Sequence, residues 1–439
     1  MNPSPIWHPC SQMKDYETFQ PLDIVAAEGP WIELADGHRL LDAVSSWWCK
    51  SLGHGHPRLK AALTAQLEQF EHVILANTTN APIRELSTRL TELCGLEYVF
   101  YAGDGATAVE IAVKMAIQAQ ALRGNASRTG LLALDQGYHG DTALCMGLSD
   151  QGIFKAPFAS LCPAVPYLGG LPLRSGQEDP AWHSCAAEWP QLEAQLAPHR
   201  DTLAAIVLEP VVQGAAGMRV YSPDLLRALR TWCDQNQVYL IADEIMTGMG
   251  RTGTALACEH AGIIPDFACL SKGLTAGWLA FSAVLTREPI YQLFYDDYDH
   301  GRNFLHSNTF SGNALAVAVA LETLNVYRDE QTFAESATLQ TRMRAGLQTV
   351  SDAVGCLGPF RGIGGLIATD LILPEQLQDQ RIGYQIYQEA TRLGALLRPI
   401  GNTLYWLPPL NISQDDIICL SEITRDAIQR VGNRLDFLP

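Results

Sequence analysis

Two short apolar segments constrain the fold of this chain more than any other feature. The segment Val238–Ala242 is followed by Asp243, and the segment Phe267–Leu270 is followed, one residue later, by Lys272. Each segment has the length and the continuous hydrophobicity of a strand buried on both faces of a sheet. Because ligands of parallel α/β sheets bind beyond the carboxyl ends of the strands, we expect Asp243 and Lys272 to share one crevice.

A carboxylate and a lysine in one crevice meet the needs of a pyridoxal phosphate (PLP) enzyme. The lysine holds the aldehyde of the cofactor as a Schiff base, and the carboxylate keeps the pyridine nitrogen protonated as an electron sink. Either residue alone favours a simpler interpretation, in which Asp243 caps a helix and Lys272 is solvated. Other motifs of the chain are needed to distinguish a PLP site from this structural interpretation.

Composition narrows the class of protein. The 439 residues are enough for two or three domains, and 47% apolar with 18% charged residues is ordinary for a globular protein. The net charge of −17 argues against nucleic acid or an anionic membrane as a partner. We find no membrane span, and the N-terminus has no basic start followed by an apolar segment, so we expect no signal peptide.

The eleven cysteines are scattered, and no Cys-x-x-Cys pair occurs. We therefore expect neither a disulfide framework nor a metal site, and most cysteines should be small buried residues. Together with the charge and the absence of a predicted leader, this indicates a soluble cytoplasmic protein.

The pattern along the chain predicts an α/β protein. The turn Asp36-Gly37 lies between two apolar segments and predicts a hairpin. From about residue 55 to 330, helices alternate with apolar strands, which indicates a mostly parallel central sheet wrapped by helices. We predict a large cofactor-binding domain over residues 55–330 and a smaller α+β domain over 331–439. Residues 1–54 should pack with the small domain.

Several loops carry polar residues after predicted strands. In Tyr101–Thr107, glycines and the start of a helix, which the apolar spacing predicts near Ala108, would offer backbone N–H groups to a phosphate, although a plain turn is the simpler interpretation. Asp104 disfavours an anion there unless it caps the helix. Tyr138 could lie flat on a pyridine ring, or be an ordinary loop aromatic. Glu209 follows another strand and could equally be a loop carboxylate.

Substrate-binding candidates lie elsewhere. Arg251 and Arg398 could clamp a carboxylate, although most arginines form surface ion pairs. Trp47 and Trp48 suit core packing, or a flat wall for a long apolar substrate. We interpret His54, in a Gly/Pro turn, as structural.

Together these segments resemble the class III, fold type I PLP-dependent aminotransferases over nearly the whole chain. Five shorter blocks resemble one subfamily, the diaminopelargonate aminotransferases of biotin synthesis: Ile6–Pro9, Ser45–Trp48, Tyr138–Thr142, Val212–Met218 and Leu397–Asn402. The resemblance implies a cytoplasmic homodimer with its active site at the subunit interface. It also implies two half-reactions that carry an amino group from S-adenosylmethionine to 8-amino-7-oxononanoate.

The resemblance also implies roles for individual residues. Lys272 would form the internal aldimine and act as the base, and Asp243 would pair with the pyridinium nitrogen. Tyr138 would stack on the ring. The phosphate would be held by Gly105, Ala106, Asn308 and Thr309, with Thr309 reaching over from the partner subunit. The substrate site would be lined by Trp47, Tyr138, Asp141, Lys272, Ser307, Arg398 and Tyr405, with Arg398 on the substrate carboxylate.

Three departures from the family pattern are present. Asp104-Gly105-Ala106 replaces a motif that ends in serine, and Ser307-Asn308 replaces Gly-Pro. Cys10 stands where users of S-adenosylmethionine have tyrosine and some lysine users have phenylalanine, and it has no phenol to offer. The donor could therefore be lysine. Another class III ω-aminotransferase (ornithine, 4-aminobutyrate or polyamine), an aminomutase or racemase, and a non-enzymatic binding protein are the alternatives.

Overall fold

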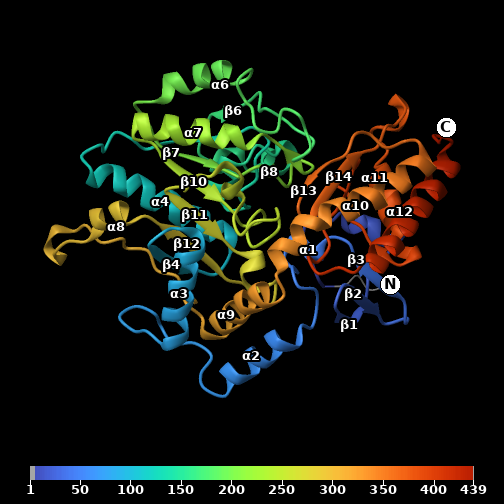
Figure 1. Ribbon diagram of the computed structural model, residues 1–439, viewed down its shortest axis with the longest axis horizontal. Coiled ribbons are helices and arrows are strands. Elements are labelled where there is room, and N and C mark those ends of the chain that lie inside the picture. The colour runs from blue at the N-terminus through green and yellow to red at the C-terminus, as the bar shows by residue number, and fades with distance from the viewer. Residues whose placement is uncertain (1–4, 439) are drawn as a thin grey trace.

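The computed structural model describes residues 5–438, so residues 1–4, on which the signal-peptide prediction partly rests, lie outside it. The chain forms a larger and a smaller part that lie side by side (Figure 1). Among the described residues, none of the helices has the length and hydrophobicity needed to cross a membrane.

A seven-stranded sheet forms the centre of the larger part. Its strands, in spatial order, are β4 (Tyr98–Ala102), β12 (Ser282–Thr286), β11 (Phe267–Leu270), β10 (Tyr239–Asp243), β7 (Leu203–Leu208), β5 (Gly130–Leu134) and β6 (Tyr167–Leu168). Strand β12 runs antiparallel to both of its neighbours, and the remaining pairs are parallel. The prediction of a mostly parallel sheet is therefore confirmed.

Helices cover both faces of this sheet, as the continuous apolar strands require. In β7, Ala205 and Val207 belong to the core cluster of helix α4 (Gly105–Leu122), whereas Ile206 and Leu208 belong to that of α7 (Pro223–Asn236). The other helices of this part are α2 (Pro57–Leu67), α3 (Ala81–Cys94), α5 (Ala143–Leu148), α6 (Trp189–Leu196), α8 (Glu288–Phe294) and α9 (Ala314–Asp329). A two-stranded sheet of β8 (Val212–Gln213) and β9 (Arg219–Val220) completes it.

The smaller part combines both ends of the chain. The N-terminal strands β1 (Ile24–Glu28), β2 (Trp31–Leu34) and β3 (Arg39–Asp42) form one sheet with β15 (Ala395–Leu396). The predicted hairpin is the antiparallel pair β2–β3. A second sheet contains β13 (Arg361–Ile363), β14 (Leu366–Asp370) and β16 (Thr403–Trp406), and the helices are α10 (Thr332–Val354), α11 (Ile382–Leu393) and α12 (Gln414–Leu435). We propose the domain boundary between α9 and α10.

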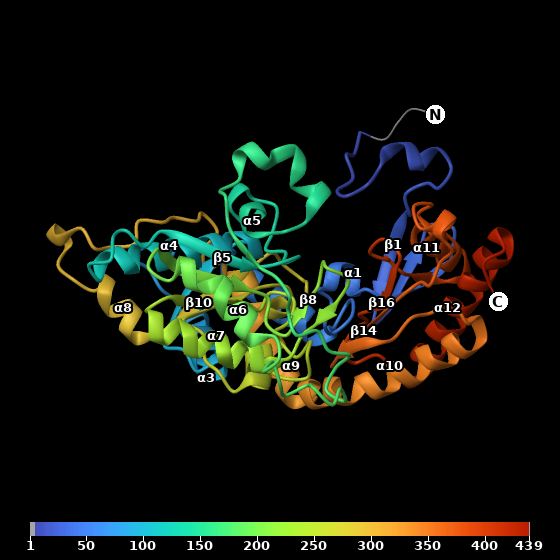
Figure 2. The same cartoon turned by 90° about the horizontal axis from the view of Figure 1, so that it is seen from above.

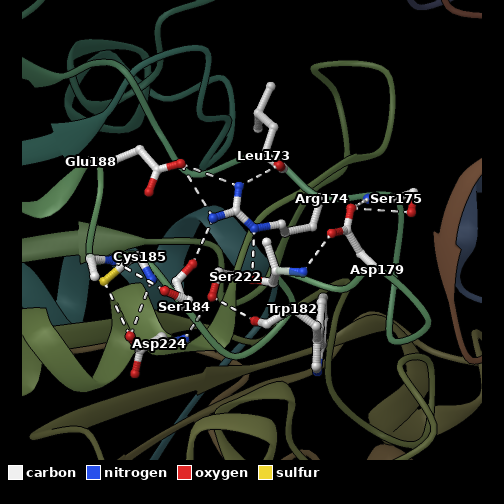
Figure 3. Close-up of polar contacts among 12 residues, drawn as sticks. Leu173, Arg174, Ser175, Asp179, Trp182, Ser184, Cys185, Glu188, Ser222 and Asp224 are labelled. Atoms are coloured by element: carbon white, nitrogen blue, oxygen red, sulfur yellow. Dashed lines mark hydrogen bonds and ion pairs between the residues drawn. The ribbon is translucent and has the colours of Figure 1, made fainter.

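The connection between β6 and α6 ties the two parts together. Arg174 donates from Nη2 to the carbonyl of Ser184 at 2.6 Å and forms an ion pair with Glu188 at 3.2 Å (Figure 3). The carbonyl of Ser175, the next residue, accepts from the backbone N–H of Gly362 in β13 at 3.1 Å. A loop held by Arg174 therefore connects the larger part to strand β13 of the smaller part through a backbone hydrogen bond.

Candidate active site

The structure brings Asp243 and Lys272 to the same edge of the sheet. Asp243 is the last residue of β10 and is in parallel register with Cys269 of β11. Lys272 begins a short 3₁₀ turn after β11, with a left-handed backbone (φ 41°). Burial lowers the pKa of Lys272, against the opposing effect of the Asp243 and Glu209 carboxylates. A buried lysine near two carboxylates has the surroundings of a general base.

A buried histidine holds the carboxylate of Asp243. His139 Nδ1 lies 2.8 Å from Asp243 Oδ2, and the backbone N–H of Ile245 donates to Oδ1 at 3.2 Å. Within the described residues, His139 Nε2 is buried without a hydrogen-bond partner. Sequence reasoning gave His139 no role, although its position directly after Tyr138 was a usable signal.

Glu209 connects two of the loops around the site. Its Oε1 accepts from the backbone N–H of Tyr138 at 3.0 Å and its Oε2 from that of Gly214 at 2.9 Å. Burial raises the pKa of Glu209 to about 7; His139 opposes this rise and Asp243 adds to it. Glu209 is thus a buried carboxylate that joins the loop of Tyr138, after β5, to the backbone of Gly214.

The start of α4 has the form of an anion cradle. The helix begins at Gly105, three residues earlier than the apolar spacing predicted, because Asp104 caps it: Asp104 Oδ1 accepts from the backbone N–H of Thr107 at 2.9 Å. Among residues 5–438, the backbone N–H groups of Gly105 and Ala106 have no hydrogen-bond acceptor, as is usual in the first turn of a helix. Asp104 therefore points to the helix, and these two donors stay available.

Close backbone contacts shape the same cradle. A Cβ added at Gly140, where φ is +121°, would lie 2.6 Å from Ala106 Cβ. A Cβ added at Gly105 would lie 2.8 Å from Ile245 Cδ1. The segments after β4, β5 and β10 therefore meet here, and the left-handed backbone and close contact at position 140 require glycine.

The segment 307–309 lies beside this cradle. A Cβ added at Gly103 would be 4.0 Å from Asn308 Oδ1, so Asn308 reaches the loop before α4 within the same chain. Ser307 and Thr309 are exposed. The Thr309 carbonyl lies 2.8 Å from His72 Nε2.

Two adjacent tryptophans connect the lysine with the predicted carboxylate clamp. The Lys272 ammonium lies 4.8 Å from the centre of the Trp48 ring, and the Arg398 guanidinium lies 4.1 Å from that of Trp47. Trp48 Nε1 donates to the hydroxyl of Tyr405 at 3.0 Å. Arg398 and Trp47 are exposed, and Tyr405 is buried. The structure thus gathers Trp47, Arg398, Tyr405 and Lys272 around one turn.

The N-terminal segment approaches the site from the smaller part. It rises above β1 on the side where α5 lies (Figure 2). Burial raises the pKa of Tyr138, and the nearby Asp141 carboxylate acts in the same direction. Cys10, although distant in the sequence, also lies in the neighbourhood of the Tyr138 hydroxyl.

The interpretation of Arg251 as a carboxylate clamp is wrong. Its side chain is buried, and Nη1 donates to the carbonyls of Gly365 and Pro408 at 2.8 Å each. Burial lowers its pKa to about 10. The fork that could hold a carboxylate instead joins the larger part to the smaller one.

The residues at the sheet edge fit PLP. The free N–H groups of Gly105 and Ala106 suit its phosphate, Asp243 suits its ring nitrogen, and Lys272 suits its aldehyde. Gln213 adds a buried side-chain oxygen that has no partner among the described residues.

Comparisons with known proteins agree with this geometry. The family model described as aminotransferase class-III matches residues 12–428. The adenosylmethionine-8-amino-7-oxononanoate aminotransferase of Nitratidesulfovibrio vulgaris is 37% identical, covering 96% of this chain and 80% of that protein. The enzyme of the same name from Geobacter sulfurreducens is 35% identical, covering 97% and 96%.

Solved structures show the same likeness. The adenosylmethionine-8-amino-7-oxononanoate aminotransferase of Methanocaldococcus jannaschii superposes with a TM-score of 0.89 at 31% identity, covering 97% of each chain. An amine transaminase from an uncultivated Pseudomonas species, in its PLP-bound form, also has a TM-score of 0.89, at 30% identity, covering 98% and 99%. The chain belongs to the class III aminotransferases, which are PLP-dependent enzymes.

Proposed function

We propose that this enzyme aminates 8-amino-7-oxononanoate to 7,8-diaminononanoate in biotin synthesis, with S-adenosylmethionine as the amino donor. The names of the relatives from N. vulgaris, G. sulfurreducens and M. jannaschii support this assignment. One observation of the structure carries it: Lys272 and Arg398 lie against adjacent tryptophans of a single turn.

This arrangement suits a substrate whose carboxylate is remote from its reacting carbon. Arg398, backed by Trp47, offers a planar fork to a carboxylate, and Lys272 marks the place of the reaction beside Trp48. The aromatic faces between them suit a methylene chain. The substrate 8-amino-7-oxononanoate has this form, with a carboxylate at C1 and a ketone at C7.

When bound, PLP supplies an electrophilic carbonyl and an electron sink. Lys272, whose pKa burial lowers, would hold the aldehyde of the cofactor and would act as the general base that moves a proton at the reacting carbon of the substrate. Asp243, held by His139 and the N–H of Ile245, would present a fixed carboxylate to the ring nitrogen of the cofactor. Tyr138, whose backbone N–H is held by Glu209, would cover one face of the ring.

The donor site contains Tyr138, Asp141 and Cys10. Asp141 is exposed and acts electrostatically on Tyr138, so its carboxylate is placed to receive the amine of a donor. Cys10 is smaller than the tyrosine or phenylalanine of the family pattern, so it would leave more space for the donor at this position. S-adenosylmethionine, with its bulky adenosyl group, is the donor that uses this space best.

We further propose a cytoplasmic homodimer with the site at the subunit interface. Apolar side chains near the segment 307–309 are exposed in the single chain, including Val73, Ile74, Leu305 and Phe310. A partner subunit would cover them and could place Thr309 on the phosphate of the other site. All eleven cysteines are free, as a reducing compartment favours.

The holoenzyme, mixed separately with S-adenosylmethionine and with lysine, tests the proposal. S-adenosylmethionine should bleach the visible absorption of the bound cofactor, and 8-amino-7-oxononanoate should restore it. Bleaching by lysine alone, with the same recovery, would reassign the donor. If 8-amino-7-oxononanoate restores nothing while simple ketones do, the enzyme is a general amine transaminase and the proposal fails.

The roles of single residues are tested with matched variants. Lys272→Ala should abolish both the visible absorption and turnover, whereas Lys60→Ala, at an exposed position of α2, should change neither. For the interface, the mixture of Lys272→Ala and Thr309→Ala subunits should recover activity that neither homodimer has. No recovery in hybrid dimers would contradict a shared site.

A further inference from the structure

The turn that carries the two tryptophans has an unusual backbone. Ser45 (φ 48°), Ser46 (φ 58°) and Trp48 (φ 65°) all have left-handed conformations, and none is glycine. Such conformations cost free energy in L-residues and persist only where neighbouring groups hold them. The positions of both tryptophan rings therefore depend on whatever holds this turn.

Asp42 holds it. The side chain is fully buried, and Oδ1 accepts from the backbone N–H groups of Val44 at 3.2 Å and Ser46 at 2.9 Å. Its Oδ2 accepts from Ser46 Oγ at 3.0 Å and lies 3.0 Å from His54 Nε2. One carboxylate thus closes the turn from the inside through several hydrogen bonds, which is the way a strained loop is stabilised.

Asp42 and His54 are themselves anchored to one place in the smaller part. The backbone N–H of Asp42 donates to the carbonyl of Pro30 at 2.7 Å. His54 exchanges two backbone hydrogen bonds with Gly29, at 2.7 and 2.9 Å. The pair therefore transmits the position of the β1–β2 connection to the tryptophan turn.

We propose that Asp42, held by His54, is a positioning residue of this active site. It sets the turn that places Trp48 against Lys272 and Trp47 under Arg398, so it controls how far the reacting centre lies from the carboxylate clamp. The inference deepens the proposed function and rests on it only for the identity of the carboxylate-bearing acceptor. Asp42 does not touch the substrate; it acts through the two tryptophans.

Asp42→Ala and Asp42→Asn test this proposal against Asp36→Ala. Asp36 is a matched control, because it lies in the turn of the same β2–β3 hairpin, accepts from the N–H of His38 at 3.0 Å and pairs with that histidine, but is exposed. Acrylamide quenching of tryptophan fluorescence in the cofactor-free protein reports the turn directly. The Trp47→Phe and Trp48→Phe backgrounds identify the rings that respond.

We expect Asp42→Ala to increase the quenching constant of these rings at least twofold. In the holoenzyme, Asp42→Ala should raise KM for 8-amino-7-oxononanoate at least tenfold. The KM for the amino donor should rise less, because Arg398 binds the carboxylate of the acceptor. Asp42→Asn keeps an oxygen for the two N–H groups and should be intermediate. Asp36→Ala should match the wild type in both measurements.

Equal quenching in Asp42→Ala and Asp36→Ala would overturn the proposal. If Asp42→Ala does not fold, Asp42→Asn and Ser46→Ala carry the test, and wild-type quenching in both overturns it as well. The quenching needs no substrate, so it stands if 8-amino-7-oxononanoate is not the acceptor. Failure of the proposed function and failure of this inference are thus seen in different experiments.

Discussion

Glu209→Gln is expected to change the pH dependence of stability. In the folded protein, burial raises the pKa of Glu209 from an ordinary 4.5 to about 7. A carboxyl whose pKa is raised by folding binds more protons in the folded state between these two values. Stability from this group is therefore greatest below pH 4.5, falls as the pH rises, and levels off above about 7.

The size of the effect follows from the same two pKa values. The full loss over the interval between the two pKa values corresponds to about 3 kcal/mol. Between pH 5.5 and 8.0, the linkage relation gives a loss of about 2 kcal/mol. Glutamine does not titrate, so the variant should escape this loss. In the variant, the NH2 group of the glutamine side chain faces one of the two backbone N–H groups, so that two donors meet. This lowers the free energy of unfolding by about 1–3 kcal/mol at every pH.

Urea unfolding of the cofactor-free protein at pH 5.5 and 8.0 is the assay, since bound PLP would add its own stabilisation. The free energy of unfolding of Glu209→Gln, minus that of the wild type, should rise by about 2 kcal/mol between the two pH values. Glu193→Gln, at an exposed position of α6, should show no such rise. An equal difference at both pH values would refute the view that burial holds Glu209 protonated.

Two further substitutions test the cradle and the tryptophan turn. Gly140→Ala should raise the dissociation constant of PLP at least tenfold by equilibrium dialysis, because its Cβ would lie 2.6 Å from Ala106 Cβ; Gly152→Ala, with no atom within 4 Å, should not. Tyr405→Phe removes the acceptor of Trp48 Nε1 and should lower the free energy of unfolding by about 1–3 kcal/mol, and an unchanged urea midpoint would contradict this.

The strands around the site were predictable because each is buried on both faces. A continuous apolar segment such as the one that forms β7 is stable where both of its faces are covered, as they are in the middle of an α/β sheet. The end of β10 at Asp243 and of β11 just before Lys272 followed directly from these segments. The start of α4 was predicted three residues late, because Asp104 is a cap and not part of the apolar period.

Pairs of residues distant in the sequence were not predictable. The contact between His139 and Asp243 spans 104 residues, and no periodicity signals it. Arg251 has the chemistry of a carboxylate clamp, but two carbonyls of the smaller part accept its hydrogen bonds. The type of a side chain limits what it can bind, whereas the fold determines which of the possible partners lies within hydrogen-bond distance.

Burial and periodicity are local properties, so the layers of the fold, the strand ends and the presence of Asp243 and Lys272 at those ends are predictable from the sequence alone. The contacts of Trp48 with Lys272 and of Trp47 with Arg398, and the hydrogen bonds by which Asp42 holds their turn beside His54, follow only from the tertiary structure. The two tryptophan contacts join segments that are far apart in the chain, so their geometry exists only after the two parts have packed together.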